Sequence, residues 1–202
     1  STALAMNKMS RSATPYDLNV LSNVSVDGDG DIAAYLAAHD VTISNYAKAT
    51  AQISVYEADM TYSELFEGQE VTFWSIDEKV PDSKVSVISI SDLNRALAMQ
   101  NKAPITLNDG QYLLNCNYNG TYRYVAAALQ SHPEITVGEV TLQRAEDKVL
   151  QETYVMTSVG NNDRGTLIVP DSVTASLEKD VNALLVQYEP NADSNEILQK
   201  MI

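Results

Sequence analysis

The residues that could do chemistry begin with an aspartate-rich stretch, VDGDGDIAAYL. An EF-hand calcium loop places oxygen ligands at positions 1, 3 and 5, a glycine at position 6 and a glutamate at position 12. With Asp27 at position 1, Asp29 and Asp31 fit, but position 6 is Ile32 and position 12 is Ala38. The stretch is therefore better explained as the start of a helix that Asp27 or Asp29 caps.

The sequence contains few side chains that could serve nucleophilic or metal-dependent catalysis. The chain has two histidines, His39 and His132, and one cysteine, Cys116. Each histidine ends a segment with a helical pattern, where an imidazole interacts favourably with the helix dipole. Cys116 lies in the apolar run YLLNCNY, which favours a buried structural thiol. Zinc-protease, nucleotide-binding and serine-hydrolase motifs are absent from the sequence, so we expect no enzyme activity, catalytic residue, cofactor or metal ion.

Two further groups of side chains are candidates for a functional site. The carboxylate pairs Glu67–Glu70 and Asp77–Glu78 would act as a glycosidase pair only if they converged in a cleft, and 27 acidic residues make chance pairs common. The chain also has 11 tyrosines, of which Tyr118, Tyr122 and Tyr124 could line a groove. The simpler expectation is that tyrosines sit at the margins of half-exposed sheets. The ligand-binding residues are left open.

The charge of the chain limits its partners. With 27 acidic against 13 basic residues, the net charge is −14, so a nucleic-acid partner is not expected. A cationic ligand such as a basic peptide would be attracted weakly and in a salt-dependent way. The longest apolar runs, such as YVAAAL, are far shorter than the roughly 20 residues of a membrane-spanning helix.

The elements that would position these side chains follow a mixed pattern of strand-like and helix-like segments. Alternation and β-branched residues predict strands at 16–22, 43–59, 71–77, 84–91, after the turn at 108–110, and at 135–143, 148–160, 166–170 and 181–190. Gly138 could break the strand at 135–143. Caps and helical spacing predict helices at 31–40, 61–68, 91–102, 121–131 and 171–179. The expected caps of the helices at 61–68, 91–102 and 171–179 are Thr61, with Glu64 three residues on, Ser91 and Asp171.

Both ends of the chain are expected to be helical stubs. Residues 4–12 carry apolar side chains without a strong cap. Residues 193–202 place Ile197, Leu198, Met201 and Ile202 on one face, and Asp193 or Ser194 could cap this helix. We expect a single α+β domain over residues 1–202, with mixed sheets and short helices on one face. Each half has a strand–helix–strand order, so residues 15–95 and 96–192 could form two similar lobes.

Several segments resemble the large extracytoplasmic domain of FtsX-like ABC transporter permeases, especially the bacitracin-export type. They are SATPYDLNV, VSVISISDLNRALAMQNKAPITLNDGQYLL, NYNGTYRYVAAAL, VLQETYVMTSV and RGTLIVPDSV. Their order and spacing are similar to that family over most of the chain. The run LIVPDSV, which follows a strand-like segment and a polar turn, is the most specific of them.

The resemblance implies a non-enzymatic domain on the extracytoplasmic side of the cell membrane, with both terminal helices leading to membrane spans. The permease would work with a cytoplasmic ATPase, and a sensor histidine kinase is a frequent partner in the bacitracin-export type. Its ligands would be antimicrobial peptides, cationic ones being compatible with the charge, or their lipid-linked cell-wall targets. The alternative is a free-standing secreted binding or adhesion module, and an acid/base hydrolase is a third hypothesis. The permease hypothesis requires both ends of the domain to lie on one side.

Overall fold

The described part of the chain forms one mixed sheet with helices packed around it. The structure, a computed structural model, describes residues 4–8, 16–23, 31–70, 83–154 and 164–201. The strands are β1 (Leu4–Lys8), β2 (Leu18–Asn23), β3 (Ala47–Thr61), β4 (Lys84–Ser89), β5 (Gln111–Asn115), β6 (Glu134–Val137), β7 (Val140–Arg144), β8 (Thr166–Val169) and β9 (Glu178–Tyr188). The helices are α2 (Ile32–Ala38), α3 (Tyr62–Leu65), α4 (Ile90–Met99), α5 (Tyr122–Ser131), α6 (Asp171–Thr174) and α7 (Ser194–Met201), with a short 3-10 turn η1 (Ile43–Asn45). The expected α+β class is confirmed.

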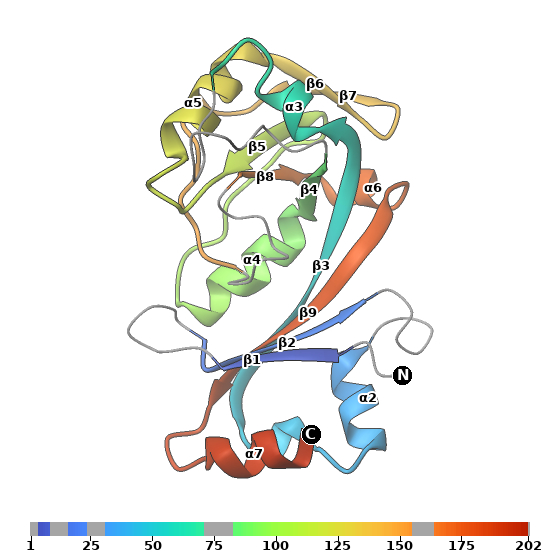
Figure 1. Cartoon of the computed structure of the whole chain (residues 1–202), viewed down its shortest axis with the longest axis vertical. Helices are drawn as coiled ribbons and strands as arrows, with labels where there is room; N and C mark the ends of the chain where they lie inside the picture. Colours follow the sequence, from blue (N-terminus) through green and yellow to red (C-terminus); the bar gives the residue numbers. More distant parts are fainter. Residues whose placement is uncertain (1–3, 9–15, 24–30, 71–82, 155–163, 202) are drawn as a thin grey trace.

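The sheet is built around two long antiparallel strands. Its order is β1-β2-β9-β3-β4-β8-β5-β7-β6, with the β4–β8 and β5–β7 pairs parallel. Strand β3 has 15 residues, which span roughly 50 Å, and β9 pairs with most of its length. Figure 1 shows the two strands crossing the molecule from its lower to its upper part. Since β3 comes from the first half of the sequence and β9 from the second, the sheet is continuous across both halves, and the division into two lobes remains a prediction.

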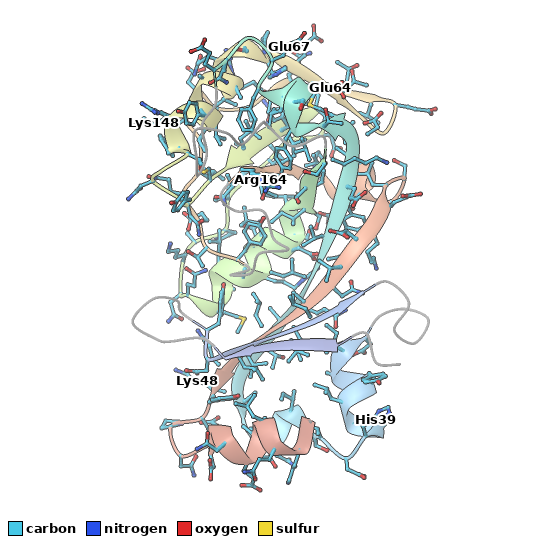
Figure 2. The ribbon with its side chains drawn as sticks, in the orientation of Figure 1. His39, Lys48, Glu64, Glu67, Lys148 and Arg164 are labelled. Carbon is cyan, nitrogen blue, oxygen red and sulfur yellow. The ribbon has the colours of Figure 1, made fainter. Side chains whose placement is uncertain are left out.

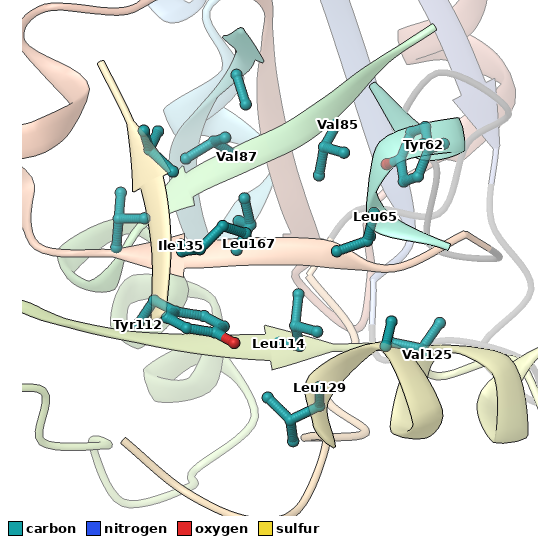
Figure 3. Packing of buried hydrophobic residues seen from close by; sticks show 14 of the residues in the cluster. Tyr62, Leu65, Val85, Val87, Tyr112, Leu114, Val125, Leu129, Ile135 and Leu167 are labelled. Atoms are coloured by element: carbon teal, nitrogen blue, oxygen red, sulfur yellow. The ribbon is translucent and has the colours of Figure 1, made fainter. Parts of the chain in front are cut away.

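The upper part of the sheet is covered on both faces. In β8, Leu167 belongs to a cluster that includes Val125 and Leu129 of α5, whereas Ile168 belongs to a cluster that includes Leu93 of α4. Figure 3 shows the first of these clusters. Because successive strand residues point to opposite faces, this alternation puts α5 and α4 on opposite sides of β8. The expectation of helices on one face is therefore wrong: the nearly continuous apolar sequence of β4, β5 and β8 requires cover on both.

A third apolar cluster fills the lower part, where the two terminal elements lie. It contains Leu18 of β2, Leu36 of α2, Val186 of β9 and Ile197 of α7. The C-terminal helix is present as expected, and Asp193 Oδ1 accepts hydrogen bonds from the first backbone N–H groups of α7. Figure 1 shows β1 and α7 in the lower part of the molecule, with β1 above α7, and both away from α3, α5 and β6.

The N-terminal helix was wrongly predicted, because residues 4–8 form strand β1. Leu4 lies opposite Ser22 and Lys8 opposite Leu18, so β1 extends the sheet beyond β2. The segment has no strong helix cap, and the unpaired edge of β2 offers its backbone a full set of hydrogen bonds. Tertiary pairing thus decides the conformation of a segment whose own preference is weak.

Two predicted strands also differ from the structure. The segment 135–143 is a hairpin of two strands, because Gly138 and Glu139 both take positive φ angles and make a two-residue turn. Within the described residues 148–154, only a single bridge, from Leu150 to Asn115, takes the place of the long strand. The strand predicted at 71–77 lies outside the described residues. The remaining strands are confirmed with shifted ends.

Candidate functional site

The aspartate-rich stretch is confirmed as a helix start at its described end. Asp31 is the N-cap of α2, and its Oδ1 accepts a hydrogen bond from the Ala34 N–H at 3.0 Å. The cap is thus Asp31 rather than Asp27 or Asp29, which both lie outside the described residues. Among the residues that the structure describes, no group of three histidine, cysteine or carboxylate side chains could hold a metal ion.

The histidines and the cysteine have structural environments. His39 ends α2, stacks on Tyr35 at 4.4 Å between ring centroids and hydrogen-bonds the Tyr35 carbonyl. His132 ends α5, and its Nε2 lies 3.0 Å from the Leu65 carbonyl oxygen. The expectation that both histidines end helices is confirmed. Cys116 is buried, as expected, with Sγ 3.5 Å from a threonine hydroxyl.

The carboxylate pairs do not form an acid/base pair in the described structure. Glu67 and Glu70 are both exposed, and Asp77 and Glu78 lie outside the described residues. Figure 2 shows Glu67 at the upper end of the molecule and His39 at the lower end.

The tyrosines are more buried than expected. Tyr16, Tyr62, Tyr112 and Tyr154 are fully buried, and only Tyr118 among the described tyrosines is a strongly exposed apolar side chain. Tyr124 is 8% exposed, so the three candidate groove tyrosines do not share one surface. Burial raises the pKa of Tyr112 to about 12, although the nearby Arg144 acts in the opposite direction.

The concave surface of the upper part is acidic. Two adjoining cavities of about 180 and 340 Å³ share Asp59 in their lining and lie where β3 ends against the β6–β7 hairpin and the start of β9. We call their six carboxylates the acidic seam: Glu57, Asp59, Glu64, Glu134, Glu139 and Glu178. One basic side chain, Lys84, lines the same surface.

Local sequence explains how the acidic seam is held. Thr61 and Glu64 form a reciprocal capping box, which starts α3 at the end of β3 and fixes the Glu64 side chain. The turn of Gly138 and Glu139 brings the β6–β7 hairpin to the other side of the cavity. Clustered carboxylates in this position attract cations, and because the groups are exposed the attraction is weak and falls with salt.

A buried polar network ties α4 to the two long strands. The carboxylate of Asp92 accepts a hydrogen bond from the Ser54 backbone N–H of β3 at 2.8 Å and pairs with Arg95. The Asp92 N–H donates to Ser89 Oγ, so Ser89 caps α4 in place of the expected Ser91. Ser54 Oγ in turn donates to Asn182 of β9 at 2.7 Å. A displacement of β9 would therefore be passed on to α4 through hydrogen bonds as well as through apolar packing.

A second polar link joins α4 to α6. The side chain of Asp171 accepts hydrogen bonds from the backbone N–H and the hydroxyl of Ser91. Asp171 was expected to cap its own helix, but Pro170 holds the N-cap position of α6 and Asp171 lies in the first turn. Sequence reasoning missed this role because the two partners are 80 residues apart.

No protein-family model matches the chain, and no curated protein matches it in sequence. None of the helices in the described part of the chain combines the length and apolarity that a membrane crossing requires.

Proposed function

We propose that the chain is the extracytoplasmic domain of an FtsX-like ABC transporter permease of the bacitracin-export type. In this proposal the domain recognises a ligand outside the membrane and transmits the resulting movement to flanking membrane helices. A cytoplasmic ATPase supplies the energy, and a sensor histidine kinase is a further partner. The ligand is a cationic antimicrobial peptide or a lipid-linked cell-wall precursor.

The observation that carries the proposal is the position of the two terminal elements. Strand β1 and helix α7 both lie in the lower part of the molecule, which is compatible with attachment of both to a membrane on that side (Figure 1). The long strands β3 and β9 run from this end to the acidic seam at the other. The hydrogen bonds of Asp92 link the same strands to α4, which supports a body that moves as a unit.

A free-standing secreted binding or adhesion module is the second candidate, and the packing of α7 favours it. Ile197 is fully buried against the lower apolar cluster, and the Lys200 ammonium donates a hydrogen bond to the Tyr46 hydroxyl at 3.0 Å. The helix is therefore docked on the body of the domain, as the last helix of an independent module would be.

The sequence of the full-length gene and its neighbours separates the two candidates. The permease proposal expects apolar spans of about 20 residues on both sides of this chain and an adjacent gene for an ATPase. A secretion signal without any span on either side would contradict it and favour the free-standing module.

Ligand recognition is tested separately by titrating the domain with cationic peptide antibiotics at low and at physiological salt. We expect binding that weakens as salt is added, because the carboxylates of the acidic seam are exposed. A flat response at both salt concentrations would remove peptide recognition from the proposal.

A further inference from the structure

Strand β6 is the outermost strand of the described sheet, and no other described strand pairs with its outer edge. Its four residues pair with β7, and the order of the described sheet ends there. Sheet edges in proteins are commonly protected by charged side chains, proline, a bulge or short length, because an unpaired row of N–H and C=O groups invites another strand. Strand β6 is short, and its one charged side chain is acidic, which disfavours an acidic added strand but not a basic one. The sequence of β6, EITV, contains neither lysine nor proline.

The alternation of hydrogen-bonded and non-hydrogen-bonded pairs along the β6–β7 hairpin shows which backbone groups of β6 face outward. The Arg144 N–H donates to the Pro133 carbonyl at 2.9 Å, and Val137 lies opposite Val140 at the turn. Bonded and non-bonded pairs alternate along an antiparallel ladder. Glu134 and Thr136 therefore occupy non-bonded positions, and their N–H and C=O groups point away from β7. This geometry offers up to four backbone hydrogen bonds to an added strand.

The open edge borders a cavity that carries negative charge. Glu134, Ile135 and Thr136 form one side of the 340 Å³ cavity, while Asp59, Met60 and Glu64 form the other. The pairing of β3 with β9 ends at Glu57 opposite Glu178, so residues 58–61 of β3 continue beyond that ladder. Three carboxylates thus stand next to an edge with unused backbone donors and acceptors.

We propose that the outer edge of β6 is a docking site for an extended basic segment of a partner polypeptide. The segment adds one strand by pairing with Glu134 and Thr136, and its lysine or arginine side chains approach Asp59, Glu64 and Glu134. This inference goes beyond the proposed function and does not depend on attachment to a membrane.

The negative charge beside β6 favours a basic segment over a lipid headgroup or a second copy of this chain. The phosphate groups of a lipid headgroup would be repelled by the carboxylates at the edge. A second copy of this chain would bring its own Glu134 next to the first, within a molecule whose net charge is −14. A basic extended segment satisfies both the backbone groups and the charge.

The first test uses the whole domain and a linear hexapeptide of alternating lysine and valine, together with the same peptide methylated on alternate backbone nitrogens. Methylation keeps the charge but removes the donors that a strand needs. We expect the unmethylated peptide to bind with amide NMR shifts at Glu134 and Thr136, and the methylated one to bind at least about tenfold more weakly. Equal affinity for the two peptides, or no binding of either, would overturn the proposal.

The second test asks whether the carboxylates beside β6 attract the peptide. The triple variant D59N/E64Q/E134Q keeps the capping box, because glutamine can replace glutamate there. The matched control D109N/E146Q/E189Q removes three exposed carboxylates outside both cavities. We expect the first variant to weaken binding about tenfold and the control to change it less than about threefold. Equal losses would show attraction to the whole molecule and reject a site at β6.

Discussion

At the scale of single residues, buried tyrosines join separate elements through hydrogen bonds of their hydroxyl groups. The Tyr62 hydroxyl donates a hydrogen bond to the Gly165 carbonyl at 2.7 Å, and the Tyr16 hydroxyl donates to the Ala96 carbonyl at 3.2 Å. Each ring fills the core while its hydroxyl forms a hydrogen bond to a backbone carbonyl of another segment. This explains why a chain with two phenylalanines has 11 tyrosines.

These tyrosines predict a loss of stability in alkali. Burial raises the pKa of Tyr16, Tyr112 and Tyr188 from 10.0 to about 12 in the folded protein. Above pH 10 the unfolded chain releases these protons first, so the free energy of unfolding is retained below pH 10 and falls as the pH rises towards 12. A tenfold difference in an acid constant corresponds to about 1.4 kcal/mol.

The measurement is the melting temperature between neutral pH and pH 11.5, with phenolate absorbance followed at the same time. We expect a constant melting temperature up to about pH 9.5 and a steep decline above it. Complete tyrosine ionisation near pH 10 without any change in melting temperature would contradict the burial described for these side chains.

Residue roles that depend on neighbours in the sequence could be predicted, and the others could not. Thr61 with Glu64, and Asp193 before α7, were identified because caps bond within three residues. Ser91 was chosen as the cap of α4 in place of Ser89, since two serines stand two residues apart and only the start of the helix decides between them. The bond from Ser91 to Asp171 is set by the fold.

At the scale of elements, the β6–β7 turn depends on the absence of a side chain at Gly138. Its φ is +54°, and a Cβ there would lie 2.8 Å from Ser176 Oγ and 3.0 Å from Leu177 Cδ2. Gly110 offers a matched comparison, because its φ is +81° and nothing lies within 4 Å of the corresponding Cβ. Substitution by alanine would cause backbone strain at both positions but steric contact only at Gly138. Comparing the two variants therefore separates the two costs.

We therefore predict that Gly138→Ala lowers the free energy of unfolding by about 2–3 kcal/mol and Gly110→Ala by about 1 kcal/mol. Urea denaturation of the two variants beside the parent protein measures both changes. Similar losses for the two substitutions would show that Ser176 and Leu177 move aside readily and that the turn tolerates a side chain.

Strands and helices with a strong local signal were predicted, whereas those decided by distant partners were not. The periodicity of α4 and the alternation of β2 are visible in the sequence. Residues 4–8 form a strand because β2 has a free edge, and residues 148–154 run along β5 with only the Leu150–Asn115 bridge, although they are rich in strand-forming side chains. Propensity cannot reveal which backbones have partners to offer.

At the scale of the whole molecule, three apolar clusters are arranged along the β3–β9 pair. The lower cluster depends on a few side chains of the last helix, chiefly Ile197, which is fully buried. We predict that Ile197→Ala lowers the free energy of unfolding by about 2–4 kcal/mol, while Gln199→Ala, at an exposed position of the same helix, changes it by less than about 0.5 kcal/mol.

Hydrogen exchange shows whether the loss is local. Because α7 packs at the lower end only, amides of α7 and of the Glu189–Tyr46 backbone bond should exchange faster in Ile197→Ala, while β5 and β8 keep their protection. Faster exchange throughout the molecule would mean that the three clusters unfold as one unit.

The charge of the candidate site could be predicted from the sequence, but its location could not. A net charge of −14 indicates attraction to cations without saying where they would bind. The acidic seam gathers carboxylates from β3, α3, the β6–β7 hairpin and the start of β9, which are far apart along the chain. Only the sheet order brings these segments together, and pairing at such separations leaves no periodic signal in the sequence.

The pairing of early with late segments also governs when the protein can fold. Asp17 accepts a hydrogen bond from the backbone N–H of Tyr188, 171 residues later, and β3 lies beside β9, which is synthesised long after it. Contacts across nearly the full chain require a long loop to close before they stabilise anything, which slows folding. Residues 47–55 of β3, which pair with β9 but not with β4, must therefore wait unpaired during synthesis. We expect this domain to fold only after translation of residue 188 and to need protection from aggregation until then.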